Sequence, residues 1–311
     1  MEFADLARWT PVRFDFSGPA PVIDWADLTA ERFVDPFFDQ TVARWVSGPH
    51  ARPLVALDSE LSLDSAGMIF HLSRCGSTLV SRLMCTVPGV VVIAEPAPLN
   101  ALLRLDADRV DETALVRLVR LLVRALGRCR HGDERQVVLK CTSWNIRRRE
   151  VLAAAFPEAP WVWVQRDPVR VLASLFAEPP GWLGLQGRPH GAARLFGLDP
   201  AALPAMSRVE FAARVLGAML DAATTDPGRR LLIDYADLTG AVWQRVAPHS
   251  GLEADAAAIE RMIEESRFYS KDPASQVFTG DAAGRRPATD EMREAAQRFA
   301  EPGYRALASR A

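Results

Sequence analysis

The stretch FHLSRCGSTLVSRLM (residues 70–84) decides the fold, because an apolar run passes there through one polar turn into a helical pattern. Such a turn can hold an anion, since the first N–H groups of a helix have no partner and the helix dipole favours negative charge. Gly76 lets the backbone approach a ligand closely, and Arg74 offers a planar cation. Ser77 and Thr78 add hydroxyl donors. The alternative is an ordinary helix start with Ser77 as its N-cap.

Short apolar runs alternate with helical patterns from residue 67 onward. This alternation predicts an α/β fold with a P-loop-like parallel sheet flanked by helices, because βα units pack in that way. The expected strands are GMIFHLS (67–73), VVVIA (90–94), QVVLK (136–140), WVWVQ (161–165) and RLLID (230–234).

The remaining segments set the expected domain organisation. Residues 1–65 are rich in Pro, Trp and Asp with only short helical patterns, and we expect an N-terminal extension on one α/β domain, residues 66–311. Helices are expected over about 207–223 and about 289–309. The Gly- and Pro-rich stretch 178–204 is too long for a simple connection, so we expect a functional lid or a disordered loop.

The composition excludes several classes of protein. The 37 basic and 39 acidic residues of this 311-residue chain nearly cancel, which argues against a general nucleic-acid or membrane-surface binder. No stretch approaches the roughly 20 apolar residues of a membrane span, and the N-terminus has no apolar signal region. The four cysteines form no CxxC pair, so we expect reduced thiols in a cytoplasmic protein.

A second expected strand is also followed by a basic residue, which indicates what kind of anion the chain binds. The loop after the first expected strand lacks the GxxxxGK[ST] spacing of a nucleotide triphosphatase, which argues against ATP. Arg166 follows the strand WVWVQ, at the edge where parallel sheets bind ligands, and Ser174 lies along the next helix. Two strands of one sheet that are each followed by a basic residue and a helix indicate a ligand with two separate anionic groups.

The order and spacing of three segments resemble the sulfotransferase superfamily. These segments are SRCGSTLVSRL, VLKCTSWNIRRREVLAAAFPEAPWVWVQRDPVRVLASL and RLLIDYADL. The closest similarity is to the branch that modifies carbohydrates and protein tyrosines. The resemblance covers about residues 67–250, so the N-terminal segment falls outside it.

The resemblance implies the donor 3′-phosphoadenosine 5′-phosphosulfate as co-substrate. It places the 3′-phosphate on Arg166 and Ser174. It places the 5′-phosphosulfate on the loop and helix start that comprise Arg74, Cys75, Gly76, Ser77, Thr78 and Leu79. Many members have Lys-Ser where this chain has Arg74-Cys75, and Cys75 would contribute its backbone N–H.

The resemblance also assigns the catalytic residues. Glu95, just past the second strand, would take the proton from the acceptor, although its position alone favours a solvated loop carboxylate. Lys140 would stabilise charge on the leaving group, and the alternative is a strand-end lysine that reaches out to solvent. Arg74 would meet the charge on the leaving phosphate. His71, inside a strand, is expected to be a core residue, but it and His190 are the alternatives should Glu95 not be the base.

Two further residues match the family loosely. Tyr235 in IDYADL stands where the family often has Arg-Tyr-Glu-Asp-Leu, and it is expected either to contact the donor or to pack in the core. Arg285, in SQVFTGDAAGRRPATDEM, is a weaker candidate for the 3′-phosphate, with a solvated turn as the alternative.

The predicted function is transfer of a sulfuryl group to a hydroxyl or amine of a small-molecule acceptor. No metal is expected, because Arg74, Lys140 and backbone N–H groups can take the role of Mg²⁺ in phosphoryl transfer. The alternatives are an ATP-dependent kinase and a non-catalytic nucleotide-binding protein of the same fold. Trp182 and Phe196 are expected either to line an acceptor pocket or to anchor the 178–204 segment.

Overall fold

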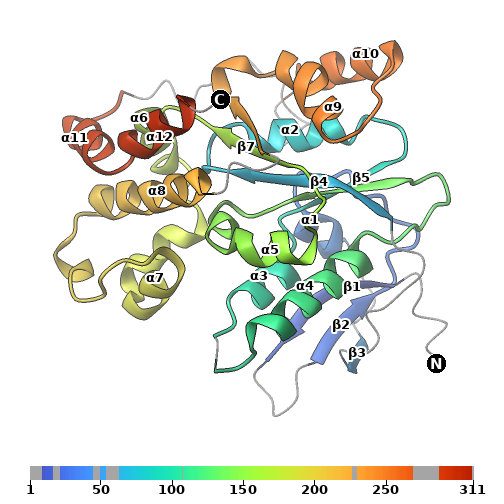
Figure 1. Cartoon of the computed structure of the whole chain (residues 1–311), viewed down its shortest axis with the longest axis horizontal. Coiled ribbons are helices and arrows are strands. Elements are labelled where there is room, and N and C mark those ends of the chain that lie inside the picture. Colours follow the sequence, from blue (N-terminus) through green and yellow to red (C-terminus); the bar gives the residue numbers. More distant parts are fainter. Residues whose placement is uncertain are drawn as a thin grey trace.

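A five-stranded parallel sheet forms the centre of the structure (Figure 1), a computed structural model that describes residues 9–16, 22–44, 50–53, 63–106, 108–225, 230–268 and 287–309. Its strand order is β5-β6-β4-β7-β8. The strands are β4 (Asp64–His71), β5 (Val90–Ala94), β6 (Gln136–Lys140), β7 (Trp161–Gln165) and β8 (Arg230–Asp234). The predicted fold class is confirmed, and the one difference among these strands is that β4 runs from Asp64 to His71 instead of 67–73.

The strands form because their runs of Val, Ile, Leu and Trp are buried on both faces of the sheet, as in parallel sheets with helices on either side. Figure 1 shows α2 (Ser77–Met84), α9 (Ala247–His249) and α10 (Ala256–Glu265) on one side of the sheet. On the other side lie α3 (Ala97–Leu103), α4 (Glu112–Leu126) and α5 (Arg149–Ala155). The carboxyl ends of the strands are therefore flanked by helices from both layers.

The N-terminal segment contains a second sheet, which the sequence analysis did not predict. The strands β1 (Thr10–Asp15), β2 (Val22–Ala26) and β3 (His50–Pro53) pair antiparallel in that order. Helix α1 (Phe38–Ala43) precedes β3, and β1 packs against α3 and α4. Ile23 and Trp25 alternate with more exposed neighbours and are buried, so a period of two was present over only a few residues.

The stretch 178–204 is not an irregular loop. It forms the 3-10 helix η4 (Gly181–Gly187), then α7 (Pro189–Phe196), with η5 (Leu203–Ala205) at its end. Trp182 and Phe196 are both buried, with ring centroids 6.1 Å apart at an interplanar angle of 68°. These aromatic side chains anchor the segment to the domain, as one of the two alternatives predicted.

The C-terminal region differs from its predicted single helix. It is divided into α11 (Asp290–Phe299) and α12 (Glu301–Ala308). Pro302 lies in the first turn of α12, where it has no N–H to continue α11 and its ring would clash with the preceding turn. Both helices pack on α8 (Arg208–Thr224), which lies within a residue of the predicted span.

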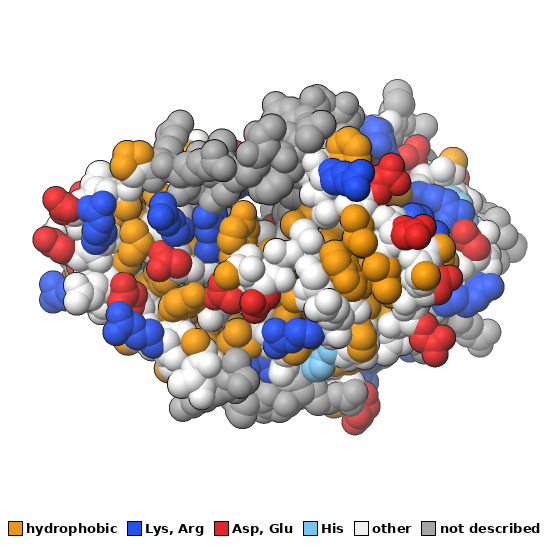
Figure 2. Space-filling model, turned by 90° about the horizontal axis from the view of Figure 1, so that it is seen from above, with side chains coloured by type: hydrophobic (Ala, Val, Ile, Leu, Met, Phe, Trp, Pro, Cys, Tyr) orange, Lys and Arg blue, Asp and Glu red, His pale blue; other side chains and the backbone are white. Residues whose placement is uncertain are grey.

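The other short elements complete the chain. They are η3 (Ser143–Arg148), α6 (Pro168–Leu175), η6 (Tyr235–Asp237) and the π-helical turn η7 (Val242–Val246). None of the helices in the described ranges has the length and hydropathy that a bilayer crossing needs. Figure 2 shows a face on which basic, acidic and apolar side chains are interspersed, in keeping with the balanced charge of the sequence.

Candidate functional site

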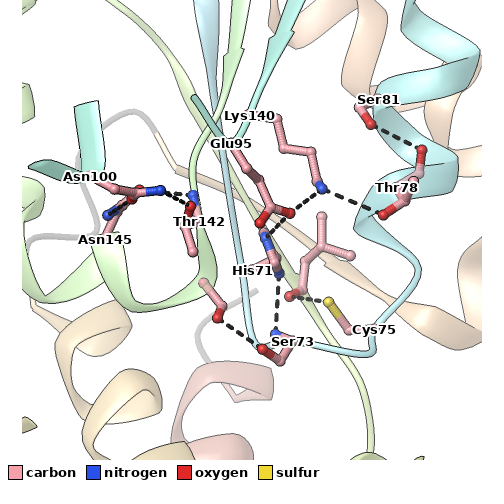
Figure 3. Close-up of polar contacts among 12 residues, drawn as sticks. His71, Ser73, Cys75, Thr78, Ser81, Glu95, Asn100, Lys140, Thr142 and Asn145 are labelled. Carbon is pink, nitrogen blue, oxygen red and sulfur yellow. Dashed lines mark hydrogen bonds and ion pairs between the residues drawn. The ribbon is translucent and has the colours of Figure 1, made fainter. Parts of the chain in front are cut away.

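The register of the parallel sheet brings three polar side chains together at one edge. Lys140, the last residue of β6, is level with Ala94 of β5 and Ile69 of β4. Glu95 is one residue beyond Ala94, and His71 is two beyond Ile69 on the same face. Figure 3 shows the three side chains pointing toward one another.

Glu95 leaves the strand in a left-handed conformation with φ 55°, which is uncommon for a residue with a side chain. Its N–H donates to the carbonyl oxygen of Lys140 at 2.7 Å, and its carboxylate contacts the Lys140 ammonium. Burial raises the pKa of Glu95, but the charge of Lys140 and the contact with His71 outweigh burial and lower this pKa to about 2. The group is therefore a carboxylate held by a cation, and not the solvated loop carboxylate that was the alternative.

Lys140 has a side chain with 0% exposure, so it does not reach out to solvent. Its Nζ lies 3.4 Å from Oγ1 of Thr78, in the first turn of α2, as well as against Glu95. The ring of Phe37 lies 5.0 Å from the same ammonium. Lys140 thus connects the first turn of α2 to Glu95.

The turn before α2 has the geometry of a ligand-binding loop. Ser73, Arg74 and Gly76 all have positive φ, of 65°, 51° and 82°. Gly76 is the N-cap of α2 and no side chain caps this helix, so Ser77 is not the N-cap that the alternative required. The first N–H groups of any helix have no intrahelical acceptor, and at the start of α2 no side-chain cap takes that place. These N–H groups therefore remain suited to an anion.

Cys75 directs its thiol away from the position where a ligand would bind the backbone. Its Sγ donates to the carbonyl oxygen of Val164 at 3.1 Å, and burial raises its pKa to about 11. The thiol is therefore protonated and inert, which agrees with a contribution from the backbone N–H alone.

Basic residues from two loops gather on the β7 side of the turn. Nε of Arg74 donates to Oγ of Ser174 at 2.9 Å, and its NH1 pairs with Glu178 at 2.7 Å. The guanidinium of Arg166 lies 4.2 Å from the centre of the Tyr235 ring and donates to the carbonyl oxygen of Arg74 at 3.4 Å. The structure thus brings together four candidate donor-binding residues of the sequence analysis, Arg74, Arg166, Ser174 and Tyr235, the last of which was expected either to contact the donor or to pack in the core.

Several residues near this site were not found from the sequence. Phe37 and Asp39 come from the N-terminal segment, which carries no motif, and Asp39 has a raised pKa because burial and the charge of Glu95 outweigh a hydrogen bond from the Ala97 N–H. Ser143 was also missed: its Oγ accepts from Ser73 at 2.8 Å. Arg285, which the sequence suggested for the 3′-phosphate, lies outside the described residues.

The comparisons with known proteins give similarities to solved structures. No protein-family model and no curated protein matches the chain. Among solved structures, the sulfotransferase STF9 of Mycobacterium avium is 14% identical, with a TM-score of 0.46 over 79% of this chain and 78% of that one. The sulfotransferase STF1 of Mycobacterium tuberculosis is 16% identical, with a TM-score of 0.45 over 78% of each chain.

A third similar structure is a sulfotransferase domain from the olefin synthase of Synechococcus PCC 7002. It is 18% identical, with a TM-score of 0.38 over 78% of this chain and 96% of that one. All three of these proteins are sulfotransferases.

Proposed function

We propose that this chain transfers a sulfuryl group from 3′-phosphoadenosine 5′-phosphosulfate to a hydroxyl or amine of a small-molecule acceptor. The observation that carries the proposal is the position of Lys140. Its ammonium contacts Glu95 on one side and lies 3.4 Å from Thr78 at the start of α2 on the other. A base, a cation and an anion-binding helix start therefore meet at one point.

The residues present fit a donor with two anionic ends. The uncapped start of α2, after Gly76, suits the phosphosulfate. Arg166 and Ser174 suit the 3′-phosphate, and both side chains are buried at the carboxyl end of β7 and in α6. Arg74 bonds to Ser174, so in this proposal it exchanges Glu178 for a phosphate oxygen when the donor binds.

The proposed reaction is a direct transfer in which each bond is accounted for. Glu95 accepts the proton of the acceptor O–H or N–H while the acceptor atom forms a bond to sulfur. The bond between sulfur and the bridging oxygen of the nucleotide breaks, and the charge that develops on this oxygen is met by Lys140 and the N–H groups of α2. The products are the sulfated acceptor and 3′-phosphoadenosine 5′-phosphate.

The charge balance of the site explains how Glu95 would become a base. While Lys140 contacts Glu95, the pKa of the carboxylate is about 2 and its affinity for a proton is low. A dianionic donor at α2 competes for the same ammonium. In the proposed complex Lys140 turns toward the donor, and the pKa of Glu95 then rises toward the range in which a carboxylate can accept a proton.

Thermal unfolding with nucleotides tests the donor. We expect 3′-phosphoadenosine 5′-phosphate to raise the melting temperature, because a ligand that binds only the folded state stabilises it. ATP with Mg²⁺ should raise it less. Stabilisation by ATP with Mg²⁺ alone would show that the chain is a phosphotransferase, and a donor that is bound but never consumed with a broad set of acceptors would favour a binding protein.

A further inference from the structure

His71 connects the anion-binding turn to Glu95 through its two ring nitrogens. It is the last residue of β4 and is 5% exposed. Its Nδ1 accepts the backbone N–H of Ser73 at 3.2 Å, so a neutral ring carries its proton on Nε2. Nε2 faces the Glu95 carboxylate, 3.5 Å from Oε1, as Figure 3 shows. The predicted core histidine is therefore part of the site.

The surroundings of His71 keep the ring neutral. Burial lowers its pKa, the positive charge of Lys140 lowers it further, and Glu95 opposes both. A neutral ring with Nδ1 occupied and a proton on Nε2 has no lone pair left for the acceptor's proton. His71 is thus unsuited to be the base, the role it was given as an alternative to Glu95.

Lys140 holds the same oxygen of Glu95 that His71 faces, and the histidine contact is the longer of the two. Both Nζ of Lys140 and Nε2 of His71 are directed at Oε1 of Glu95, and the histidine is the more distant partner. At 3.5 Å the histidine contact is long for a hydrogen bond. When Lys140 turns to an anion, His71 remains, among the described residues, as a donor that faces the carboxylate.

The other partner of His71 is fixed from several sides. Ser73 has a φ of 65°, donates from Oγ to Oγ of Ser143 at 2.8 Å, and accepts from Nε1 of Trp182 at 3.3 Å. Because the backbone N–H of Ser73 donates to Nδ1 of His71, a shift of Ser73 would also shift the ring of His71.

We propose that His71 is a positioning residue, which holds the Glu95 carboxylate through Nε2–H and the entrance of the anion-binding turn through Nδ1. This inference rests on the proposed sulfuryl transfer. It adds that donor binding at the turn and orientation of the base are coupled through one imidazole ring.

Two substitutions separate the two contacts, because each amide matches one ring nitrogen. His71→Asn keeps an acceptor near the Nδ1 position for Ser73 but cannot reach Glu95. His71→Gln places a donor near the Nε2 position for Glu95 but loses the acceptor for Ser73. His190→Asn is the matched control: His190 is exposed on α7, and no described contact joins it to Glu95, Lys140 or the turn before α2, so the structure does not place it with the candidate base.

The kinetic test measures kcat, the donor KM and the pH profile of each variant. We expect His71→Asn to lower kcat by about 10²-fold at nearly constant donor KM, because the base is misplaced. His71→Gln should raise the donor KM by about 5-fold, as expected for one lost hydrogen bond, with kcat largely retained. His190→Asn should change neither.

The pH profile separates positioning from a structural role. Lys140 from β6 and Asp39 from α1 also act on Glu95, and neither is changed in these variants. Loss of the Nε2–H raises the pKa of Glu95, so the acidic limb of the kcat profile should move to higher pH in His71→Asn and not in His71→Gln. Equal losses in both variants without any movement of this limb would contradict the proposal.

Nitrogen NMR of the imidazole tests His71 without any turnover. We expect a ring protonated on Nε2 alone, with a Nε2 signal that moves in Glu95→Gln and not in a His190→Asn protein. A ring protonated on Nδ1, or a signal indifferent to Glu95→Gln, would overturn the proposal. If 3′-phosphoadenosine 5′-phosphate does not bind while the NMR result holds, the proposed function fails and the His71–Glu95 contact stands.

Discussion

At the scale of single residues, the Lys140 ammonium has two partners that compete for it. It neutralises Glu95 and lies next to Thr78, where the phosphosulfate is proposed to bind. A buried charge that loses one partner must find another, since an isolated charge at this depth is costly. In the proposed function the donor supplies that second partner, and its binding would then also release Glu95 to act as the base.

The Glu95–Lys140 pair predicts how stability depends on pH. The pKa of Glu95 is lowered from 4.5 to about 2 on folding, so the carboxylate stabilises the folded state above about pH 4.5 and less as the pH falls toward 2. We expect wild type to exceed Glu95→Gln by roughly 3 kcal/mol at pH 6, and this difference to vanish near pH 2. Urea unfolding at several pH values measures it. A difference that is constant with pH would show that the pair does not account for the effect.

Arg166 provides the second test at this scale. Arg166→Ala should weaken binding of 3′-phosphoadenosine 5′-phosphate by roughly 1.5–3 kcal/mol, the usual size of a hydrogen bond to a charged group. Binding of the same nucleotide without its 3′-phosphate should weaken far less. Calorimetry measures both, and Arg170→Ala, an exposed arginine in α6, is the control. Equal losses for the two nucleotides would mean that Arg166 does not read the 3′-phosphate.

At the scale of elements, the sequence predicted which segments meet at the edge of the sheet but not how their side chains pair. The apolar runs and the polar residues after them were sufficient to locate the ends of β6 and β7, and the end of β4 to within two residues. The contacts among His71, Glu95 and Lys140 depend on strand order, which places β6 between β5 and β4. No local pattern carries that order, because it arises from pairing between distant segments.

The turn before α2 gives the prediction at this scale. Gly76 and Gly132 both have a φ of 82°, but a Cβ at Gly76 would lie 2.5 Å from Leu238 whereas one at Gly132 would meet nothing within 4 Å. Gly132→Ala should therefore cost about 1–2 kcal/mol of stability from φ alone. Gly76→Ala should cost more and should also weaken nucleotide binding.

Urea unfolding and calorimetry of the two glycine variants check this expectation. If Gly76→Ala were as stable as Gly132→Ala and bound the nucleotide normally, the packing of Leu238 and Tyr235 on the turn would have no role in the site. A larger loss of stability in Gly76→Ala with normal nucleotide binding would remove the turn from the proposed donor site.

At the scale of the whole molecule, the N-terminal segment and the α/β domain both contribute residues to the candidate site. Phe37 and Asp39 lie near Lys140 and Glu95, although they belong to a segment with no recognisable motif. The three-stranded sheet of that segment was missed because its alternation is short and its partners are far apart in the chain. The fold of the domain was thus predictable from local patterns, while the part of the candidate site formed by Phe37 and Asp39 depends on a tertiary contact.

The central claim is that the chain consumes 3′-phosphoadenosine 5′-phosphosulfate with Glu95 as the base. The most direct measurement is chromatographic detection of released 3′-phosphoadenosine 5′-phosphate, with a panel of hydroxyl and amine acceptors, for wild type and Glu95→Gln. We predict release by wild type that depends on the acceptor, and a rate about 10²–10⁴-fold lower in Glu95→Gln with donor affinity that does not fall. Equal release by the two proteins, or release of ADP from ATP in place of any consumption of the sulfuryl donor, would contradict this account.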